Sequence, residues 1–299
     1  MPEISVILPT YGEPDRLVTT INSVINQSFS DIELIVVDDN NPTSEYRNKT
    51  SDIVKVFASQ DKRVRYICHD HNKNGSAARN TGIRESKGKY LSFLDSDDEY
   101  ATDRLLKCYN ILKERRDKEF QGVYTGCEFR RNGKPYHIET SMADGNYLVQ
   151  CLASTFNICS GSNIFITKEA ALEINGFDES FIRQQDIEFL VRFFQHFSIL
   201  GIKEVLLVKN QDGKNRPSPE KLEKIKAQFL KTFESCIKIQ QKKDQDYIYS
   251  HHYQQIAEQY LAVGNRIKAL EYYNAVKSLN GYSFKCIIRK YCYLLKLLR

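Results

Sequence analysis

The sequence has 299 residues, of which 41% are hydrophobic and 27% charged, an ordinary balance for a soluble globular protein. This composition excludes disordered and fibrous proteins, and the length is enough for one large domain or two smaller ones. No run of about 18 apolar residues occurs, and the N-terminus lacks a basic segment before an apolar one, so we expect a cytoplasmic chain. The eight cysteines form no C-x-x-C pair, which predicts free thiols in a reducing compartment.

The net charge of +5 is distributed unevenly along the chain. Residues 217–299 contain 15 Lys and Arg against 7 Asp and Glu, whereas residues 1–216 contain 28 against 31. A basic segment of this kind suits an acidic partner subunit or an anionic membrane surface. Nucleic acid is disfavoured as a partner because no recognised nucleic-acid motif accompanies the charge.

The first hundred residues alternate between apolar β-type runs and segments with helical spacing. Strands are predicted at 4–8, 32–37, 64–67 and 90–94, and helices at 14–28, 44–59 and 76–86. Alternating strands and helices predict an α/β fold with a mainly parallel, doubly wound sheet, covered by helices on both faces. The polar residues that follow each strand should then meet at one edge of the sheet.

The pattern continues with less regular spacing up to a polar segment. It predicts a helix at 102–117, a strand at 122–126, a hairpin over 128–147 turning at Asn132-Gly133, a strand at 159–166, a helix at 185–196 and a strand at 205–208. Residues 209–219 are polar, with one Gly and two Pro, and form the best domain boundary. We therefore expect one domain over 1–210 and a second over 217–299.

The second domain is predicted to be all helical. One long helix is expected over 219–243, and helices at 249–262 and 267–279 form a hairpin around Gly264-Asn265, with spacing close to a tetratricopeptide repeat. A lone repeat must cover its apolar face with another element or subunit, which predicts a homo-oligomer. Residues 281–299 hold five basic and no acidic residues beside an apolar stripe. They suit peripheral membrane contact, or a packed helix with a solvated basic face.

Three carboxylates follow the apolar strand at 90–94. Asp95, Asp97 and Asp98 should lie just past the end of the strand, where open α/β sheets bind ligands. Their oxygens suit Mn²⁺ or Mg²⁺, which commonly bridge to nucleotide phosphates. The alternative is that these residues cap the helix beginning near Thr102.

Four segments in order resemble the family 2 glycosyltransferases, which are inverting nucleotide-sugar enzymes with the GT-A fold. The resemblance covers about residues 3–208, and its four motifs together are specific where each alone is weak. The segments are Ile4 to Tyr11, Ser23 to Asn40, Asn74 to Gly82 and Phe93 to Asp98.

The resemblance implies a pocket for a UDP-sugar. Asp39 would accept a hydrogen bond from N3 of uracil, and Tyr11 would offer its ring to the base. Arg79 would reach the nucleotide or its phosphates, and Asp97, with Asp95, would hold the metal ion. A helix cap is the alternative for Asp39, and a surface ion pair the alternative for Arg79. The implied donor-binding residues are Pro9, Thr10, Tyr11, Glu13, Asp39, Arg79, Asp95, Ser96 and Asp97.

Inversion requires a base that takes the proton of the attacking hydroxyl. In the family it lies at the start of a helix, behind a Gly-Phe-Asp-Glu turn, and the corresponding pair here is Gln185-Asp186. The usual Glu is replaced by Gln185, so the resemblance assigns the base to Asp186, with Glu188 as a second candidate and a helix cap as the alternative role. Arg192 is a weaker candidate for phosphate or acceptor contact, and residues 159–163 for the border of the acceptor site.

The chain lacks the Gln-x-x-Arg-Trp motif and membrane spans of processive synthases, so we expect one sugar per encounter. The expected reaction moves a hexose or N-acetylhexosamine from a UDP-sugar to a surface polysaccharide, a lipid-linked oligosaccharide or a glycoprotein. A nucleotidyltransferase is disfavoured because no Gly-rich, Lys-bearing loop follows the first strand. A catalytically decayed scaffold acting through its helical tail is the other alternative, disfavoured because the predicted site residues are intact.

Overall fold

The computed structural model describes residues 1–115, 119–211 and 217–279. These residues fall into two compact units, one made of 1–146 and 157–211 and the other of 147–156 and 217–279. Residues 147–156 belong to the helical unit, whereas the sequence predicts that the whole of 1–210 forms the first domain. The second unit therefore takes one of its parts from the middle of the sequence.

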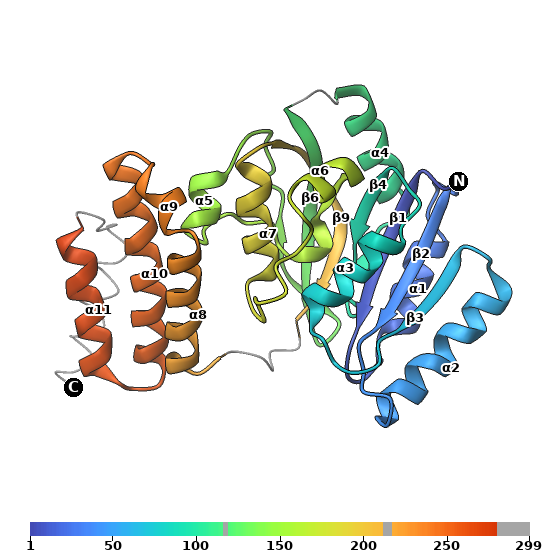
Figure 1. Cartoon of the computed structure of the whole chain (residues 1–299), viewed down its shortest axis with the longest axis horizontal. Coiled ribbons are helices and arrows are strands. Elements are labelled where there is room, and N and C mark those ends of the chain that lie inside the picture. Colours follow the sequence, from blue (N-terminus) through green and yellow to red (C-terminus); the bar gives the residue numbers. More distant parts are fainter. Residues whose placement is uncertain (116–118, 212–216, 280–299) are drawn as a thin grey trace. The chain divides into compact units, whose positions relative to one another are not determined.

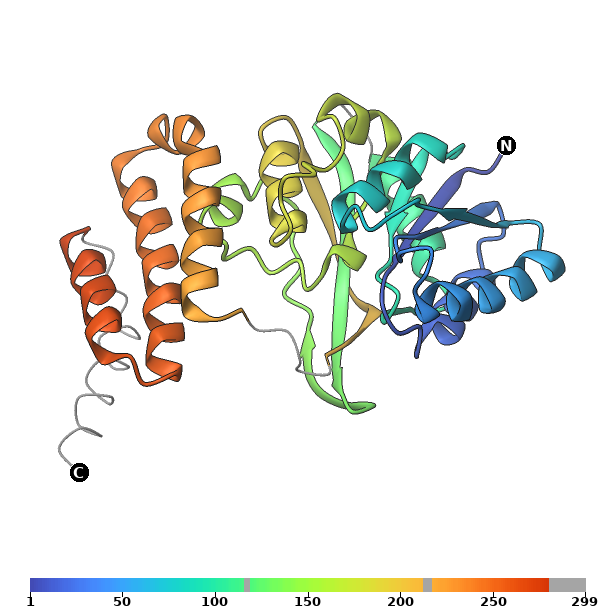
Figure 2. The same ribbon diagram turned by 60° about the horizontal axis from the view of Figure 1, so that its bottom comes forward.

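The described part of the first unit contains a nine-stranded sheet (Figure 1). Its strand order is β3-β2-β1-β4-β8-β6-β9-β5, and β7 pairs with β6 to form the predicted hairpin, which Figure 2 shows extending beyond the other strands. The strands are β1 Ile4–Thr10, β2 Ile32–Asp38, β3 Val64–Cys68, β4 Tyr90–Phe93, β5 Glu99–Tyr100, β6 Phe120–Arg131, β7 Lys134–Glu139, β8 Phe165–Thr167 and β9 Ser198–Asn210.

Strands β3, β2, β1 and β4 run parallel, and β6 runs parallel to β9. Strand β8 is antiparallel to both β4 and β6 and joins the two parallel groups. The predicted α/β class is confirmed. Because β1, β2 and β4 are parallel neighbours, the residues that follow them meet at one edge of the sheet, as the sequence predicts.

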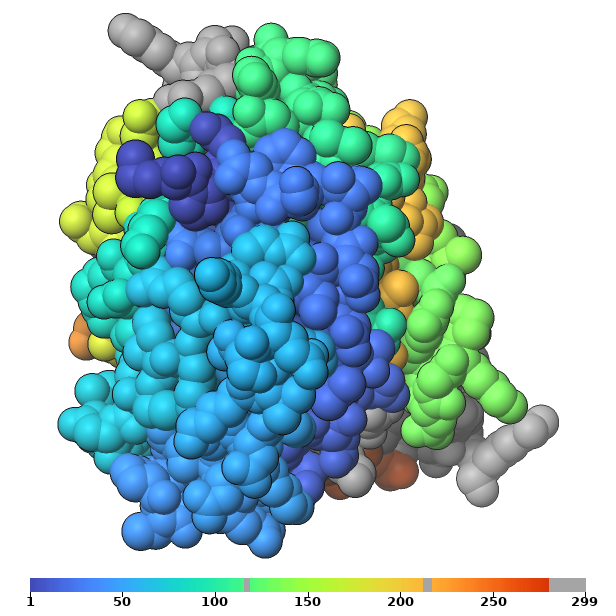
Figure 3. Space-filling view, turned by 90° about the vertical axis from the view of Figure 1, so that its right-hand side faces the viewer, coloured from blue at the N-terminus to red at the C-terminus, as the bar shows by residue number. Residues whose placement is uncertain are grey.

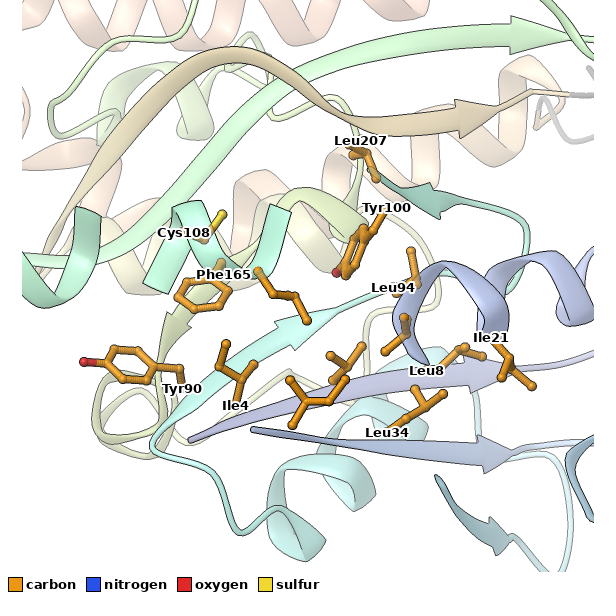
Figure 4. Packing of buried hydrophobic residues seen from close by; sticks show 14 of the residues in the cluster. Ile4, Leu8, Ile21, Leu34, Tyr90, Leu94, Tyr100, Cys108, Phe165 and Leu207 are labelled. Atoms are coloured by element: carbon orange, nitrogen blue, oxygen red, sulfur yellow. The ribbon is translucent and has the colours of Figure 1, made fainter. Parts of the chain in front are cut away.

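Helices cover both faces of the sheet. Helices α1 (Leu17–Ile25), α2 (Glu45–Gln60) and α4 (Arg104–Arg115) bury their apolar sides in one large core, part of which Figure 4 shows around Leu8, Leu34 and Cys108. Figure 3 views this unit from the side of α2.

Helix α3 (Gly75–Glu85) covers the other face, where Ala78 packs with Ile35 and Val37. Helix α7 (Gln185–Phe194) shares this face, since Phe189 stacks on Phe177 with ring centroids 4.2 Å apart and Phe93 of β4 lies edge-on to both rings. Helix α6 (Lys168–Glu173) follows β8. The shared face brings the first turns of α3 and α7 together.

Two predicted elements differ from the structure in kind or in number, whereas others differ only in their bounds. In place of one strand at 159–166, a short 3₁₀ turn, η1 (Gly161–Asn163), precedes β8, because the Ser160 hydroxyl accepts a hydrogen bond from Ser162 N and the Asn163 side chain bonds to nearby backbone. The single helix predicted over 219–243 is instead two helices, α8 (Pro219–Thr232) and α9 (Glu234–Lys238).

The second unit consists of helices over its described residues. It contains α5 (Leu148–Leu152), α8, α9, α10 (Lys242–Ala262) and α11 (Arg266–Ser278). Helices α10 and α11 form the predicted hairpin around Gly264, whose φ of +82° suits glycine, and α5 joins α10 where His252 Nε2 donates to the Leu152 carbonyl. The relation to tetratricopeptide repeats stays a prediction.

The basic segment at 281–299 lies outside the described residues. Within the described ones, we find no helix that combines the length and the apolar character needed to cross a membrane.

Candidate active site

The three carboxylates after β4 have different surroundings. Asp98 is fully buried, and its Oδ2 accepts hydrogen bonds from the hydroxyls of Ser160 (2.9 Å) and Ser162 (2.6 Å). Its Oδ1 accepts a hydrogen bond from Asn210 N at 3.1 Å. Asp98 therefore ties the segment after β4 to η1 and to the end of β9, and it has no exposed oxygen for a ligand.

Asp95 faces the first turns of α3. Its Oδ1 lies 2.6 Å from a guanidinium nitrogen of Arg79, and its backbone N–H donates to the Ser162 hydroxyl. Burial works against ionisation of Asp95, but the positive charges of Arg79 and Lys209 outweigh it and hold the pKa below its ordinary value. Asp95 is therefore ionised at neutral pH and already paired with a cation.

Asp97 is the exposed member of the three. Loss of solvation, together with repulsion from Asp98 and Asp95, raises its pKa to about 7, although Lys209 opposes the shift. Its side chain makes no ion pair with any residue that the structure describes. A carboxylate with neighbouring negative charge and open oxygens is suited to a divalent cation.

Arg79 joins the strand ends to α7. Besides its ion pair with Asp95, it donates to Gln185 Oε1 at 3.0 Å, and its guanidinium lies 5.5 Å from the centre of the Phe177 ring. Gly75 leaves room for this contact, since a Cβ there would lie 3.0 Å from atoms of both Arg79 and Gln185. The replacement of the family's Glu by Gln185 thus puts a neutral hydrogen-bond acceptor beside Arg79.

The predicted base, Asp186, lies beside this network. A Cβ placed on Gly161 would be 3.7 Å from the Asp186 Cβ and 3.8 Å from an Arg79 nitrogen, so η1, α3 and α7 meet here. Asp186 is partly buried in the first turn of α7, and its Oδ1 accepts a hydrogen bond from Ile187 N. The structure therefore places Asp186 close to Arg79.

Lys209, at the end of β9, is a member of the site that sequence reasoning missed. Its Nζ lies 3.6 Å from Asp98 Oδ2, and its side chain is 19% exposed. Burial disfavours its charge, but four nearby carboxylates outweigh burial and raise its pKa: Asp98, Asp95, Asp97 and Asp186. The sequence contains one signal for Lys209, namely that it directly follows the apolar run of the predicted strand at 205–208. The segment it begins, 209–219, was interpreted as a linker between domains.

Asp39 is buried, and both of its carboxylate oxygens have partners. Oδ1 accepts from His69 Nδ1 (2.7 Å) and Lys73 N (2.8 Å), and Oδ2 accepts from the Asn72 side chain (2.8 Å) and Asn74 N (2.9 Å). A carboxylate has about four lone-pair positions, and these four donors use them. Uracil N3 would have to replace one donor, and exposed Asn72 is the one that can rotate away.

The other predicted pocket residues follow β1. The Thr10 carbonyl accepts from Asp39 N at 2.9 Å, and Gly12 N donates to the Asn40 side chain, which fixes the backbone of the turn. Tyr11 is 65% exposed, so its ring is free to meet a base. Glu13 is exposed and pairs with Lys49, and Pro9 is the penultimate residue of β1.

Two weaker candidates bind each other. Glu188 is 1% exposed, and both of its oxygens receive hydrogen bonds from Arg192, at 2.6 and 2.7 Å. Arg192 also donates to the Ile174 carbonyl. This pair holds α7 against the loop before it, and it leaves Asp186 as the partly exposed carboxylate in the first turn of α7.

The described residues offer some of the oxygen ligands that a divalent cation needs, but not a full set. Asp97 supplies open oxygens and Asp95 one oxygen not used by Arg79. The described residues contain no group of three or more His, Cys, Asp and Glu side chains arranged to hold a metal ion. Phosphate oxygens and water would have to complete the coordination, as they commonly do for Mg²⁺.

Comparisons with known proteins bear on the family of the chain. Residues 5–174 match the family described as Glycosyl transferase family 2. An uncharacterized glycosyltransferase of Haemophilus influenzae is 34% identical over 53% of this chain and 60% of its own length. The amylovoran biosynthesis glycosyltransferase AmsB of Erwinia amylovora is 29% identical over 69% of this chain and 67% of its own length.

A further relative, the GalNAc(5)-diNAcBac-PP-undecaprenol beta-1,3-glucosyltransferase of Campylobacter jejuni, is 27% identical over 60% of this chain and 56% of its own length. Among solved structures, S. aureus TarS 1-349 in complex with UDP-GlcNAc superposes with a TM-score of 0.60 at 17% identity, covering 92% of this chain and 90% of that chain. This likeness shows the fold. On the family match, the chain belongs to glycosyl transferase family 2 and is a glycosyltransferase.

Proposed function

We propose that this glycosyltransferase moves one hexose or N-acetylhexosamine from a UDP-sugar to a glycan acceptor, with inversion at the anomeric carbon. The names of its relatives support a glycan acceptor, since they describe amylovoran biosynthesis and glucosyl transfer to an undecaprenol-linked oligosaccharide. The TarS structures with UDP and UDP-GlcNAc support a UDP-sugar donor.

One observation carries the proposal: a single polar network joins the end of β4, the start of α3 and the start of α7. Asp95, Arg79 and Gln185 are linked by direct hydrogen bonds, and Asp186 is the next residue of α7. Segments far apart in the sequence thus place a partly exposed carboxylate beside cationic groups. This is the charge arrangement that a displacement of a sugar from a diphosphate requires.

In the proposed step, the acceptor oxygen forms a bond to the anomeric carbon while the bond from that carbon to the diphosphate oxygen breaks. The electron pair of the broken bond leaves with UDP, and Asp186 takes the proton of the acceptor hydroxyl. Arg79 and Lys209 offset the charge that develops on the diphosphate. Tyr11 and the turn after β1 hold the uracil ring of the donor. The donor pocket is lined by Pro9, Thr10, Glu13, Asp39 and Ser96.

We assign Asp97, assisted by Asp95, as the ligands of Mn²⁺ or Mg²⁺. The bound ion would neutralise negative charge on the diphosphate. The basis is chemical, since Asp97 has open oxygens and a pKa raised by loss of solvation and by its acidic neighbours. Chelation with EDTA should therefore abolish UDP release and weaken UDP binding, and added Mn²⁺ should restore both.

The test is a screen of UDP-sugars against anionic and neutral glycan acceptors, with UDP release as the readout and NMR to assign the product anomer. We expect one donor to exceed the others by at least tenfold and to give the inverted anomer. A retained anomeric configuration, or transfer from CDP- or GDP-sugars in preference to every UDP-sugar, would overturn the proposal.

A further inference from the structure

The second unit contains a cavity of about 370 Å³ that the transfer site does not explain. It lies among α8, α9, α10 and α11, all within the helical unit. The residues of its wall that matter here are Glu223, Lys226, Glu234, Tyr249, Tyr253 and Tyr272. The volume is at the small end of the range for small-molecule pockets, about 300–1,000 Å³. We call this cavity the Lys226 pocket.

Lys226 is buried without a counter-charge. Its side chain is 2% exposed, and no ion pair or hydrogen bond to it occurs among the described residues. Burial lowers the pKa of Lys226 to about 8. A buried ammonium that lacks a carboxylate is costly to the folded state, so such groups are normally paired or serve a ligand.

The carboxylates nearest in the wall are already used. Glu223, one helical turn before Lys226, accepts a hydrogen bond from the Tyr260 hydroxyl at 2.7 Å and another from Tyr272. Glu234 pairs with Lys238 at 2.6 Å. His252 on α10 is another titratable group near Lys226. Its Nε2–H donates a hydrogen bond to the Leu152 carbonyl, and burial lowers its pKa to about 3, so the imidazole is neutral.

Three tyrosine rings form another part of the wall. The centre of the Tyr253 ring lies 6.2 Å from that of Tyr249 and 5.9 Å from that of Tyr272. Tyrosine offers an apolar face and a polar tip, so a row of tyrosines suits a ligand that has both C–H faces and hydroxyl groups. A sugar ring has this character, and an anionic substituent on it would meet Lys226.

We propose that the Lys226 pocket binds an anionic sugar unit, either a uronate or a sugar phosphate, with its oxyanion on the Lys226 ammonium. The pocket is a second carbohydrate site, outside the transfer chemistry. If the bound sugar is an acidic unit of the acceptor glycan, that identification of the ligand rests on the proposed function. The binding of an anionic sugar to the pocket does not rest on it. Lys231 is exposed at the wall and adds positive charge.

The test measures binding to the full-length protein by calorimetry, with four probes: glucuronate, glucose 6-phosphate, glucose and inorganic phosphate. We expect glucuronate or glucose 6-phosphate to bind at least tenfold more tightly than glucose and inorganic phosphate. Lys226→Met should remove this preference, and the matched control Lys224→Met, an exposed lysine of the same helix, should keep it. The urea midpoint of Lys226→Met, which should not fall, shows that the variant is folded.

A second readout labels amines at pH 8 and quantifies each lysine by mass spectrometry. The preferred sugar should protect Lys226 and leave Lys224 unchanged. No binding by any probe, equal binding of glucose, inorganic phosphate bound as tightly as the sugar phosphate, or unchanged binding in Lys226→Met would each overturn the inference. UDP binding is measured on the same samples, so that failure of this site is distinguished from failure of the transfer site.

Discussion

At the scale of single residues, neighbouring acids with the same sequence context have different tasks. Asp95 is paired with Arg79, Asp97 is exposed, and Asp98 is buried among hydroxyls. The difference is produced by η1 and β9, which contribute Ser160, Ser162 and Asn210 from positions 62 to 112 residues away. The sequence identified the acidic cluster, but only the tertiary contacts show that Asp98 is buried by structural partners while Asp97 stays exposed.

Asp39→Asn tests whether this buried carboxylate orders the loop at 72–74. In asparagine an NH₂ group replaces one of the two acceptor oxygens. This NH₂ group would face N–H donors that now bond to the carboxylate, so those hydrogen bonds would be lost. We expect the free energy of unfolding to fall by about 2–3 kcal/mol. Urea unfolding measures this, and Glu13→Gln, an exposed carboxylate of the same pocket, should change it by less than about 0.5 kcal/mol. Equal stability of Asp39→Asn and the wild type would contradict a role in ordering the loop.

At the scale of elements, the site depends on how closely α3 approaches the sheet. A Cβ on Gly82 would lie 2.9 Å from Ile7 Cγ1, and Ile7 is a fully buried residue of β1. The close approach fixes the distance between α3 and β1. It thereby also fixes the position of Arg79, which lies one helical turn before Gly82. Glycine is required here for packing, since its φ is not positive.

Gly82→Ala should therefore destabilise the protein, although alanine favours helix formation by about 1 kcal/mol. Overpacking against Ile7 costs about 1–3 kcal/mol and exceeds that gain. In an Ile7→Ala background the same substitution should cost nothing or stabilise. Urea unfolding of the four proteins in this double-mutant cycle gives the coupling energy, and an identical cost in both backgrounds would show that the contact does not limit the helix.

The sequence predicted the regular elements well where short-range patterns decide them. The alternation from β1 to β4 and the hinge at Gly264 follow from periodicity and turn chemistry. The 3₁₀ turn at Gly161–Asn163 was missed because its polar side chains bond to Asp98, Thr125 and the local backbone, and no periodicity reports such contacts. Lys209 was missed for the same reason, since its acidic neighbours come from the segment after β4 and from α7.

At the scale of the whole molecule, both units expose apolar side chains, and three of those on the helical unit are close together in the sequence. Val263, Ile267 and Leu270, around the turn from α10 to α11, are 60%, 77% and 45% exposed. Exposed apolar side chains clustered in this way are typical of an interaction site. Self-association of the helical unit stays a prediction, and these residues are the place to test it.

Ile267→Lys with Leu270→Lys should therefore lower the particle mass from light scattering to that of one chain, because two ammonium groups cannot be buried in an apolar interface. The matched control replaces Val18 and Val56, exposed apolar residues of the first unit, by lysine and should leave the mass unchanged. A wild type that is monomeric at micromolar concentration, or an equal mass for both double variants, would contradict this prediction.

The central claim is that Asp186 removes the proton of the acceptor. The most direct measurement compares kcat and UDP affinity of the wild type, Asp186→Asn and the exposed control Asp52→Asn with the preferred donor. We predict that Asp186→Asn lowers kcat by about 100- to 10,000-fold, with UDP affinity and the urea midpoint unchanged. A kcat for Asp186→Asn within about threefold of the wild type would contradict the assignment of the base and the mechanism built on it.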